Sequence, residues 1–351
     1  MSNNSVVVDD INELPEEFWE GNSGNGEPYG MFNLTASRMF GRVPEILPDQ
    51  SIVGTNPCAE IGLANRESCN LSEVFLPNVT SEEELVDITR LIYKVQKAIA
   101  AMPYLDRESD EITSQNMRLG LGVTGIAQAQ DKLGWLGTTY TALRAFDRIW
   151  SAANGWPESV RLTTVKPSGT LSLLAGVTPG VHPGFSQYHI RRVRMSVGDP
   201  LLQYCSDLGY TVEWVRNLDG SRSDTTKLVE FPCQFPQDTM LAEDVSAVQQ
   251  MELQRTLQEQ WADNSVSVTI YIKPGELGEV RSYLESHWRT MKSVSFLLHT
   301  THGFDQAPLE AINKEDYTRM VEGLVTSTEG PQGGMSELLD DECLSGACPI
   351  R

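Results

Sequence analysis

The sequence predicts an α/β protein built on a parallel sheet, and one stretch near its end carries most of that prediction. Between residues 266 and 272, apolar and polar residues alternate with the two-residue period of a half-buried strand. After Pro274 and Gly275, helical spacing follows over residues 277–291, and residues 293–298 form a second apolar run. This strand–helix–strand order is typical of a βαβ unit, whose two strands run parallel.

Two more helices and a tail are expected elsewhere. Ser81-Glu-Glu-Glu84 is a capping box that begins a helix, and Pro103 ends it. The apolar residues at helical spacing within it are Leu85, Ile88, Ile92, Val95, Ile99 and Met102. The other helix covers about 244–261. Because residues 330–342 are rich in Gly, Ser and acids, we expect one domain over 1–328 with peripheral helices and a flexible tail over 329–351.

The amino-acid composition indicates a soluble globular protein and argues against binding to nucleic acid. Of 351 residues, 40% are hydrophobic and 21% charged, as in a soluble globular chain, and the net charge is −21. Such an acidic surface repels nucleic acid, although backbone N–H groups can still hold a small phosphorylated ligand. There is no apolar run long enough for a membrane span and no signal peptide, so we expect a cytoplasmic protein, or one of the host cytoplasm if it is viral.

Cysteine, amide and carboxylate alternate in Asn56-Pro-Cys58-Ala-Glu60. Alternating residues of an extended loop project to the same side, so the three side chains are able to face one substrate. They offer a sulfur for radical or nucleophilic chemistry, a base and an orienting amide. On spacing alone, a loop that merely buries a cysteine remains the favoured interpretation.

Five other cysteines occur, and a disulfide framework is not expected in a cytosolic chain. Cys69 lies eleven residues after Cys58 and, taken alone, is explained as a buried apolar residue. Cys343 and Cys348 lie in the expected tail, where two thiols can close a disulfide and move between an interior and a reductant. Cys205 is expected in the core, and Cys233 has no assigned role.

Residues Lys166-Pro167-Ser168-Gly169-Thr170 follow a strand-like segment and precede an expected helix. Small residues and hydroxyls at that position are typical of an anion site, although an ordinary helix cap explains them equally well.

Two other motifs are set aside. Gly120-Leu-Gly-Val-Thr-Gly125 matches a dinucleotide-binding fingerprint but follows a long helix and lacks the later acidic residue. His299 and His302 do not have a common zinc spacing, and we expect no metal.

Together the motifs resemble the catalytic subunit of adenosylcobalamin-dependent (class II) ribonucleotide reductases, most nearly the monomeric ribonucleoside-triphosphate reductases. The resemblance rests on Asn56–Glu60, Cys69, Asn116–Gly122, Lys166–Thr170, Gly180–Gly184 with Arg191-Arg192, Asp263–Val266, and Cys343 with Cys348. These motifs follow the family order along nearly the whole chain.

The resemblance implies the C-terminal half of a ten-stranded α/β barrel, with a finger loop that carries the radical cysteine. It implies that Cys58 is the thiyl site, that Glu60 takes the substrate's 3′-hydroxyl proton, and that Asn56 holds the substrate hydroxyls. Cys69 is then one of two reducing thiols. Pro167, Ser168, Gly169 and Thr170 hold the substrate phosphates, and Cys343 and Cys348 carry electrons from a thioredoxin-like reductant. The implied cofactor is adenosylcobalamin, and the implied substrate is a ribonucleotide.

The family's first barrel half, with the second reducing thiol and the effector site, has no counterpart in this sequence. The sequence is therefore either a naturally split subunit or a fragment of a longer chain, and we expect the N-terminal half of the reductase as its partner. A class I reductase, which receives its radical through adjacent tyrosines, is the alternative, but the chain has no Tyr-Tyr pair. A second alternative is a non-catalytic nucleotide-binding remnant, against which the intact Asn-x-Cys-x-Glu set argues.

Overall fold

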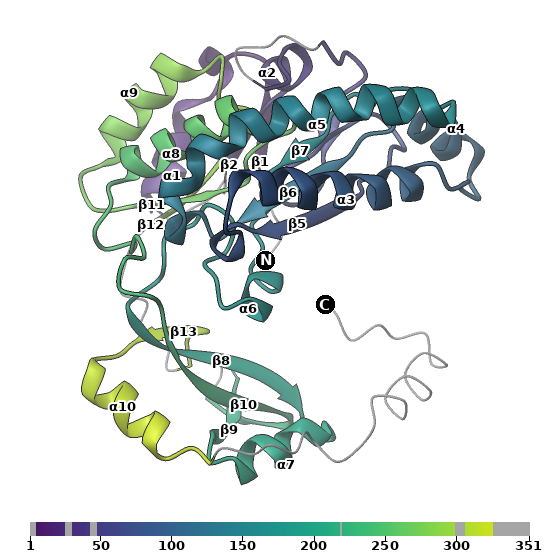
Figure 1. The fold of residues 1–351 in the computed structure, drawn as a ribbon. Helices are drawn as coiled ribbons and strands as arrows, with labels where there is room; N and C mark the ends of the chain where they lie inside the picture. The colour runs from purple at the N-terminus through teal and green to yellow at the C-terminus, as the bar shows by residue number, and fades with distance from the viewer. Residues whose placement is uncertain (1–4, 25–29, 43–47, 218–219, 299–305, 326–351) are drawn as a thin grey trace. The chain divides into compact units, whose positions relative to one another are not determined.

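A computed structural model describes residues 5–24, 30–42, 48–217, 220–298 and 306–325, in two compact units (Figure 1). Unit 1 comprises Met1–Gly184 and Pro236–Thr300, and unit 2 comprises Phe185–Phe235 and Thr301–Arg351. The expected tail, including Cys343 and Cys348, lies outside the described residues, as do His299 and His302. The boundary expected at residue 328 therefore stays a prediction. No helix in the described part of the chain is long and apolar enough to cross a membrane.

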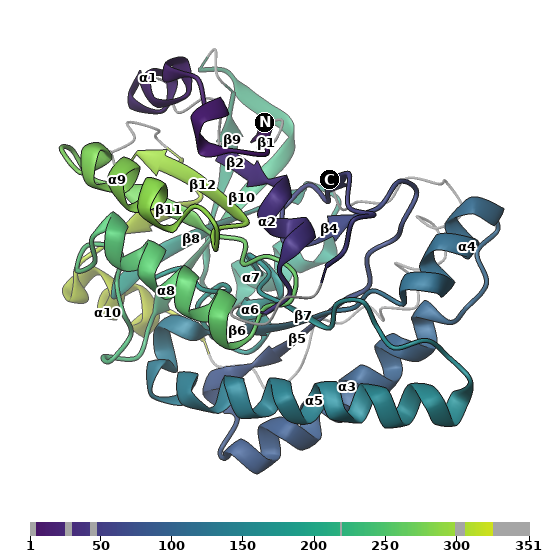
Figure 2. The same ribbon diagram turned by 90° about the horizontal axis from the view of Figure 1, so that it is seen from above.

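Unit 1 combines strands with helices that cover them. Its strands are β1 (Ser5–Val8), β2 (Gly30–Asn33), β3 (Gly54–Thr55), β4 (Gly62–Leu63), β5 (Leu71–Phe75), β6 (Gly120–Thr124), β7 (Thr163–Thr164), β11 (Thr269–Ile272) and β12 (Ser293–Leu298). Its α-helices are α1 (Glu16–Gly24), α2 (Leu34–Met39), α3 (Glu82–Ala100), α4 (Arg107–Asn116), α5 (Leu133–Asn154), α6 (Leu171–Leu174), α8 (Ala247–Gln260) and α9 (Leu277–His287). Figure 2 shows α3 and α5 running past the same strands, and α3 packs on both β5 and β6.

Unit 1 contains two groups of parallel strands, which belong to two different sheets. Strands β5, β6 and β7 are parallel neighbours, as are β11 and β12. A parallel bridge between Val165 and Val266 connects the two groups. The βαβ unit expected from the sequence is confirmed, because α9 joins β11 to β12 and β12 has the expected bounds.

Two further strands, β1 and β2, run antiparallel to β11 and β12. Strand β2 pairs antiparallel with β12, and β1 pairs parallel with β2. Among the described residues, β1 and β5 each pair with one neighbour, so both are edge strands. Edge strands present unpaired backbone groups, which commonly recruit another chain.

Helix α3 departs from its predicted form in two ways. Ser81 caps it as expected, but the Glu84 carboxylate accepts from the Thr80 N–H instead of closing the capping box on Ser81. Of the predicted apolar face, Val95, Ile99 and Met102 are exposed. The buried face instead includes polar residues that hydrogen bond inward, and its members are Leu85, Thr89, Tyr93, Gln96, Lys97 and Ala100.

Unit 2 is a small antiparallel sheet flanked by helices, which the sequence analysis did not anticipate. Its strands are β8 (Tyr188–Ser196), β9 (Thr211–Arg216), β10 (Arg222–Gln234) and β13 (Leu309–Ala311), in the order β13-β8-β10-β9. Its helices are α7 (Pro200–Asp207) and α10 (Lys314–Glu322). Cys205 is buried in its core beside Leu202 and Val229, as expected for that cysteine.

Candidate active site

The Cys58 motif lies on a tight turn between β3 and β4, which pair antiparallel. The Asn56 carbonyl accepts from Ala59 N at 2.9 Å, and the Asn56 side-chain oxygen accepts from Ile61 N at 3.1 Å. Pro57 occupies the second position of this turn, which its fixed φ favours, and Ala59 has a φ of 60°. The segment is therefore a turn and not the extended loop that the sequence analysis assumed.

Three backbone contacts fix this turn against the sheet. The Glu60 carbonyl accepts from Ser265 N and from Thr164 Oγ1, each at 2.9 Å. The Cys58 carbonyl accepts from Ser267 Oγ at 2.6 Å. Cys58 and Glu60 are thus held where β7 ends and where the chain enters β11.

Cys58, Glu60, Cys69 and Lys166 lie within electrostatic reach of one another. Partial burial raises the pKa of the Cys58 thiol, the Glu60 carboxylate raises it further, and Lys166 opposes both. The Cys69 thiol is affected in the same way, with burial as the largest cause. The structure therefore brings together two cysteines that the sequence separates, and both are free thiols with exposed surface.

Glu60 is the buried carboxyl group of this cluster, with 2% of its surface exposed. Burial raises its pKa, against the opposing effects of the Asn56 side chain and Lys166. Its Oε2 is buried and has no hydrogen-bond partner among the described residues. A carboxylate in this state is suited to accept a proton from a bound molecule.

Cys69 is positioned by its neighbour Asn70, at the start of β5. Asn70 and Gln96 of α3 exchange two hydrogen bonds, at 2.7 and 2.8 Å. The Asn70 carbonyl also accepts from Gly120 N of β6 at 2.9 Å. These contacts fix the backbone beside the thiol to both a helix and the adjacent strand.

The Lys166–Thr170 loop follows β7, and α6 after it is a single turn. Ser168 is buried and has a φ of 51°, whereas Gly169 and Thr170 are exposed. Ser168 Oγ donates to Glu73 Oε2 at 2.8 Å, and Lys166 Nζ lies 3.6 Å from the same oxygen. Sequence reasoning did not identify Glu73 and gave Lys166 no role, because their pairing depends on strand register.

Other motifs in the resemblance have structural roles. His182 Nε2 accepts from Thr269 N at 3.0 Å, so its Nδ1–H donates to the Pro179 carbonyl and the ring is neutral. Burial lowers the pKa of His182 and favours this neutral form. Arg118 forms buried ion pairs with Asp49 and Glu67.

A second group of buried charges supports the sheet from Asp263, which is 0% exposed. The Asp263 carboxylate accepts from Tyr140 Oη at 2.6 Å and from Arg144 Nη2 at 2.7 Å. Lys292 Nζ donates to three carbonyls, those of Gly41, Asp263 and Asn264. Lys97 pairs with Asp147 in the core, where both side chains are 0% exposed.

The glycine fingerprint at residues 120–125 is a buried strand and not a nucleotide loop. All five residues of β6 are buried. A Cβ on Gly120 would lie 2.5 Å from Leu71 Cδ2 and 2.8 Å from Ile61 Cδ1, so close packing explains this glycine without a nucleotide. Among the described residues, no group of three His, Cys, Asp or Glu side chains gathers that would hold a metal ion.

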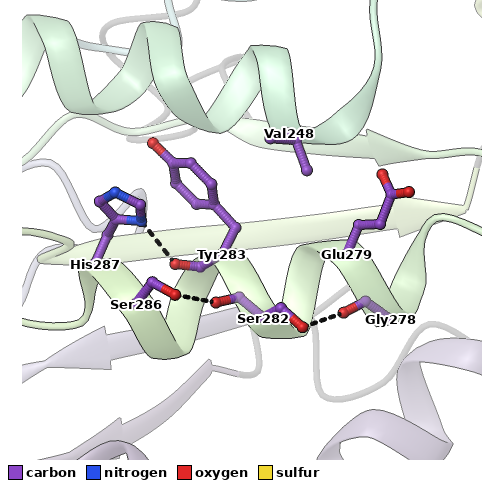
Figure 3. Close-up of a pocket in the computed structure, with 7 residues that line it drawn as sticks. All are labelled: Val248, Gly278, Glu279, Ser282, Tyr283, Ser286 and His287. Carbon is purple, nitrogen blue, oxygen red and sulfur yellow. Dashed lines mark hydrogen bonds between the residues drawn. The ribbon is translucent and has the colours of Figure 1, made fainter.

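The described residues also line a cavity of about 450 Å³ beside α8 and α9. In Figure 3, Tyr283 and His287 stack on α9 near Val248 of α8, and their ring centroids are 4.1 Å apart. None of the cysteine-site residues lines this cavity. We take the cluster around Cys58 as the candidate active site, because it combines two free thiols with a buried carboxyl group.

Comparisons with known proteins show which proteins the chain is similar to. Residues 2–152 match the family described as "Ribonucleotide reductase, barrel domain". A solved structure, described as a B-12 dependent (class II) ribonucleotide reductase, superposes with a TM-score of 0.81 at 30% identity. The match covers 99% of this chain and 52% of that one.

Two curated relatives are also similar to this chain over about half of their own lengths. The adenosylcobalamin-dependent ribonucleoside-triphosphate reductase of Lactobacillus acidophilus is 33% identical, over 100% of this chain and 52% of its own length. The enzyme of the same description from Euglena gracilis is 38% identical, over 85% of this chain and 41% of its own length. The chain thus spans about half the length of the curated relatives it matches.

Proposed function

The chain belongs to the adenosylcobalamin-dependent (class II) ribonucleotide reductases and aligns with the C-terminal half of its relatives, and from this premise we propose that it carries the radical-bearing part of such an enzyme. The reaction converts a ribonucleotide and two thiols into a 2′-deoxyribonucleotide, a disulfide and water. We propose a ribonucleoside triphosphate as the substrate, because the matched relatives are described as triphosphate reductases.

The observation that carries this proposal is a cluster in which Cys58 and Glu60, held on a turn anchored to the sheet, lie within electrostatic reach of Cys69. The turn corresponds to the family's finger loop. Cys58 takes the 3′-hydrogen of the substrate as a thiyl radical, and Glu60 accepts the 3′-hydroxyl proton. The buried, unpartnered Glu60 Oε2 supports this role, since a raised pKa favours proton uptake. Asn56 holds the substrate hydroxyls.

Adenosylcobalamin, when bound, supplies the oxidising equivalent that converts a thiol to a thiyl radical. The exposed surface of Cys58 fits a cofactor that has to reach its sulfur. The absence of a Tyr-Tyr pair in the sequence argues against the class I route.

The remaining assignments complete the cycle. Cys69 supplies one of the two reducing thiols, and the N-terminal half of the reductase supplies the other. The loop of Pro167, Ser168, Gly169 and Thr170 receives the substrate phosphates. Cys343 and Cys348 then reduce the active-site disulfide and are themselves reduced by a thioredoxin-like protein.

Reconstitution tests this function. We expect the 351-residue chain alone, with adenosylcobalamin and a dithiol, to produce no dCTP, because the second reducing thiol is missing. With a chain that supplies the other half, we expect a one-to-one complex, cob(II)alamin formation on mixing with substrate and effector, and dCTP. The measurements are absorbance, sedimentation and product analysis. Turnover by the chain alone would disprove the assignment of the second reducing thiol to the N-terminal half, and an assembled complex without cob(II)alamin or product would disprove the function.

The tail is tested separately. In the reconstituted enzyme we expect Cys343→Ser to give about one product per enzyme with thioredoxin, because the active-site thiols are spent once and not reduced again. A small dithiol that reaches the site directly should restore turnover. Cys233→Ser, at a half-buried cysteine of unit 2, is the matched control. Full turnover of Cys343→Ser with thioredoxin would rule out the shuttle.

A further inference from the structure

Glu73 and Lys166 meet across the middle strand of β5, β6 and β7. In the strand register, Glu73 lies beside Gly122, and Gly122 lies beside Thr164, two residues before Lys166. A Cβ on Gly122 would lie 3.5 Å from Glu73 Cγ and 3.6 Å from Lys166 Cδ. Because Gly122 has no side chain, the side chains of Glu73 and Lys166 have room to approach each other next to it.

Glu73 makes a second contact with the Lys166–Thr170 loop, through Ser168. The Ser168 backbone is in the left-handed region, which is unfavourable for a residue other than glycine. Its hydroxyl donates to Glu73 Oε2, and its carbonyl accepts from Ser172 Oγ at 2.6 Å. The strained residue is therefore held at both its side chain and its backbone.

The backbone of Gly180 packs closely against the same loop. Gly180, with a φ of 55°, lies so close to Lys166 that a Cβ there would be 2.2 Å from the Lys166 carbonyl oxygen. This backbone packing and the contacts with Glu73 leave the loop little freedom. Glu73 Oε1, which is buried, has no hydrogen-bond partner among the described residues.

We propose that Glu73 is a positioning residue, which Lys166 orients, and that it holds Ser168 in the left-handed conformation needed for the loop to receive the substrate's phosphates. This inference rests on the proposed function and refines it. The Ser168 hydroxyl group donates its proton to Glu73 and not to a phosphate. We therefore assign Ser168 to the shape of the loop. The exposed Gly169 and Thr170 then take the phosphates.

Three variants of the reconstituted enzyme test the inference. Glu73→Ala removes the acceptor for Ser168, and we expect the KM for a ribonucleoside triphosphate to rise about tenfold, a factor equivalent to ~1.4 kcal/mol, with kcat less affected. Glu73→Gln keeps an oxygen that accepts from Ser168 and should stay near the wild-type KM. Glu73→Ala combined with Ser168→Gly should recover most of the loss, because glycine adopts a positive φ without support.

Glu285→Ala is the matched control, since it removes a carboxylate from an exposed ion pair with Arg281 on α9. Its KM should equal that of the wild type. Titration calorimetry with CTP, without cofactor, gives a second readout that does not need turnover. Equal CTP affinity in Glu73→Ala and wild type, or no recovery on adding Ser168→Gly, would overturn the positioning role alone. A wild-type assembly that binds no CTP would overturn the proposed function and this inference together.

Discussion

Cys58→Ser is expected to reduce release of the substrate's 3′-hydrogen to background in the reconstituted enzyme. A thiyl radical requires a sulfur, because the serine O–H bond is too strong to be formed and broken reversibly in this exchange. The Cys58 carbonyl, not its side chain, anchors the turn through Ser267, so serine should leave the local fold intact. The measurement is tritium release from substrate labelled at the 3′ position.

Two comparisons make that result specific. Cys233→Ser changes a half-buried cysteine of unit 2 and should release tritium at the wild-type rate. Cys69→Ser should still release 3′-hydrogen while failing to complete reduction, since Cys69 acts after abstraction. Tritium release by Cys58→Ser at the wild-type rate would end the assignment of Cys58 as the radical site.

Asp263→Ala is expected to cause the largest loss of stability. The carboxylate accepts from Arg42 N, Tyr140 Oη, Leu162 N and Arg144 Nη2. Removing one partner of a buried ion pair costs about 3–5 kcal/mol, since the remaining charge and donors stay buried. In a unit of this size the melting temperature should fall by roughly 10 °C, measured by calorimetry on the full chain.

The same carboxyl group gives a pH dependence. Burial alone raises the pKa of Asp263, but Arg144 and Arg161 outweigh it and hold the pKa below its ordinary value. The stabilisation is therefore present above the unfolded pKa of about 4 and is lost as the pH falls through the folded pKa. Asp263→Ala should lack this component. Glu285→Ala, at an exposed pair, should change the free energy of unfolding by less than ~1 kcal/mol. A similarly small change in Asp263→Ala would contradict the role of the network.

Local patterns predicted local structure well. The alternation over 266–272, the helical spacing over 277–291 and the apolar run at 293–298 located β11, α9 and β12, because each pattern depends on neighbours in sequence. Strand β11 begins later than predicted, at Thr269, and α9 ends earlier, at His287. Unit 2 was missed because its strands carry charged residues such as Arg192 and Glu230, which pair with each other and hide any apolar alternation.

The members of the candidate site were selected by the family resemblance, since the spacing of Cys58 and Glu60 alone favoured an ordinary loop. The geometry was not predictable, because the approach of these residues to Cys69 depends on contacts with Thr164 and Ser265, far along the chain. The pairing of Glu73 with Lys166 follows from the register of three strands. Sequence spacing does not encode such a register, so no local motif was able to reveal it.

Two buried lysines make it possible to follow opening of the core by chemical labelling. Lys97 and Lys292 are 0% and 2% exposed, and burial lowers the pKa of both amines. An amine-reactive reagent cannot reach them while unit 1 is closed, whereas exposed lysines such as Lys314 acquire label from the folded chain. Label on Lys97 or Lys292 would therefore record opening of the core around each one. Their two labelling rates would tell whether the α3–α5 layer and the Asp263 network open together or separately.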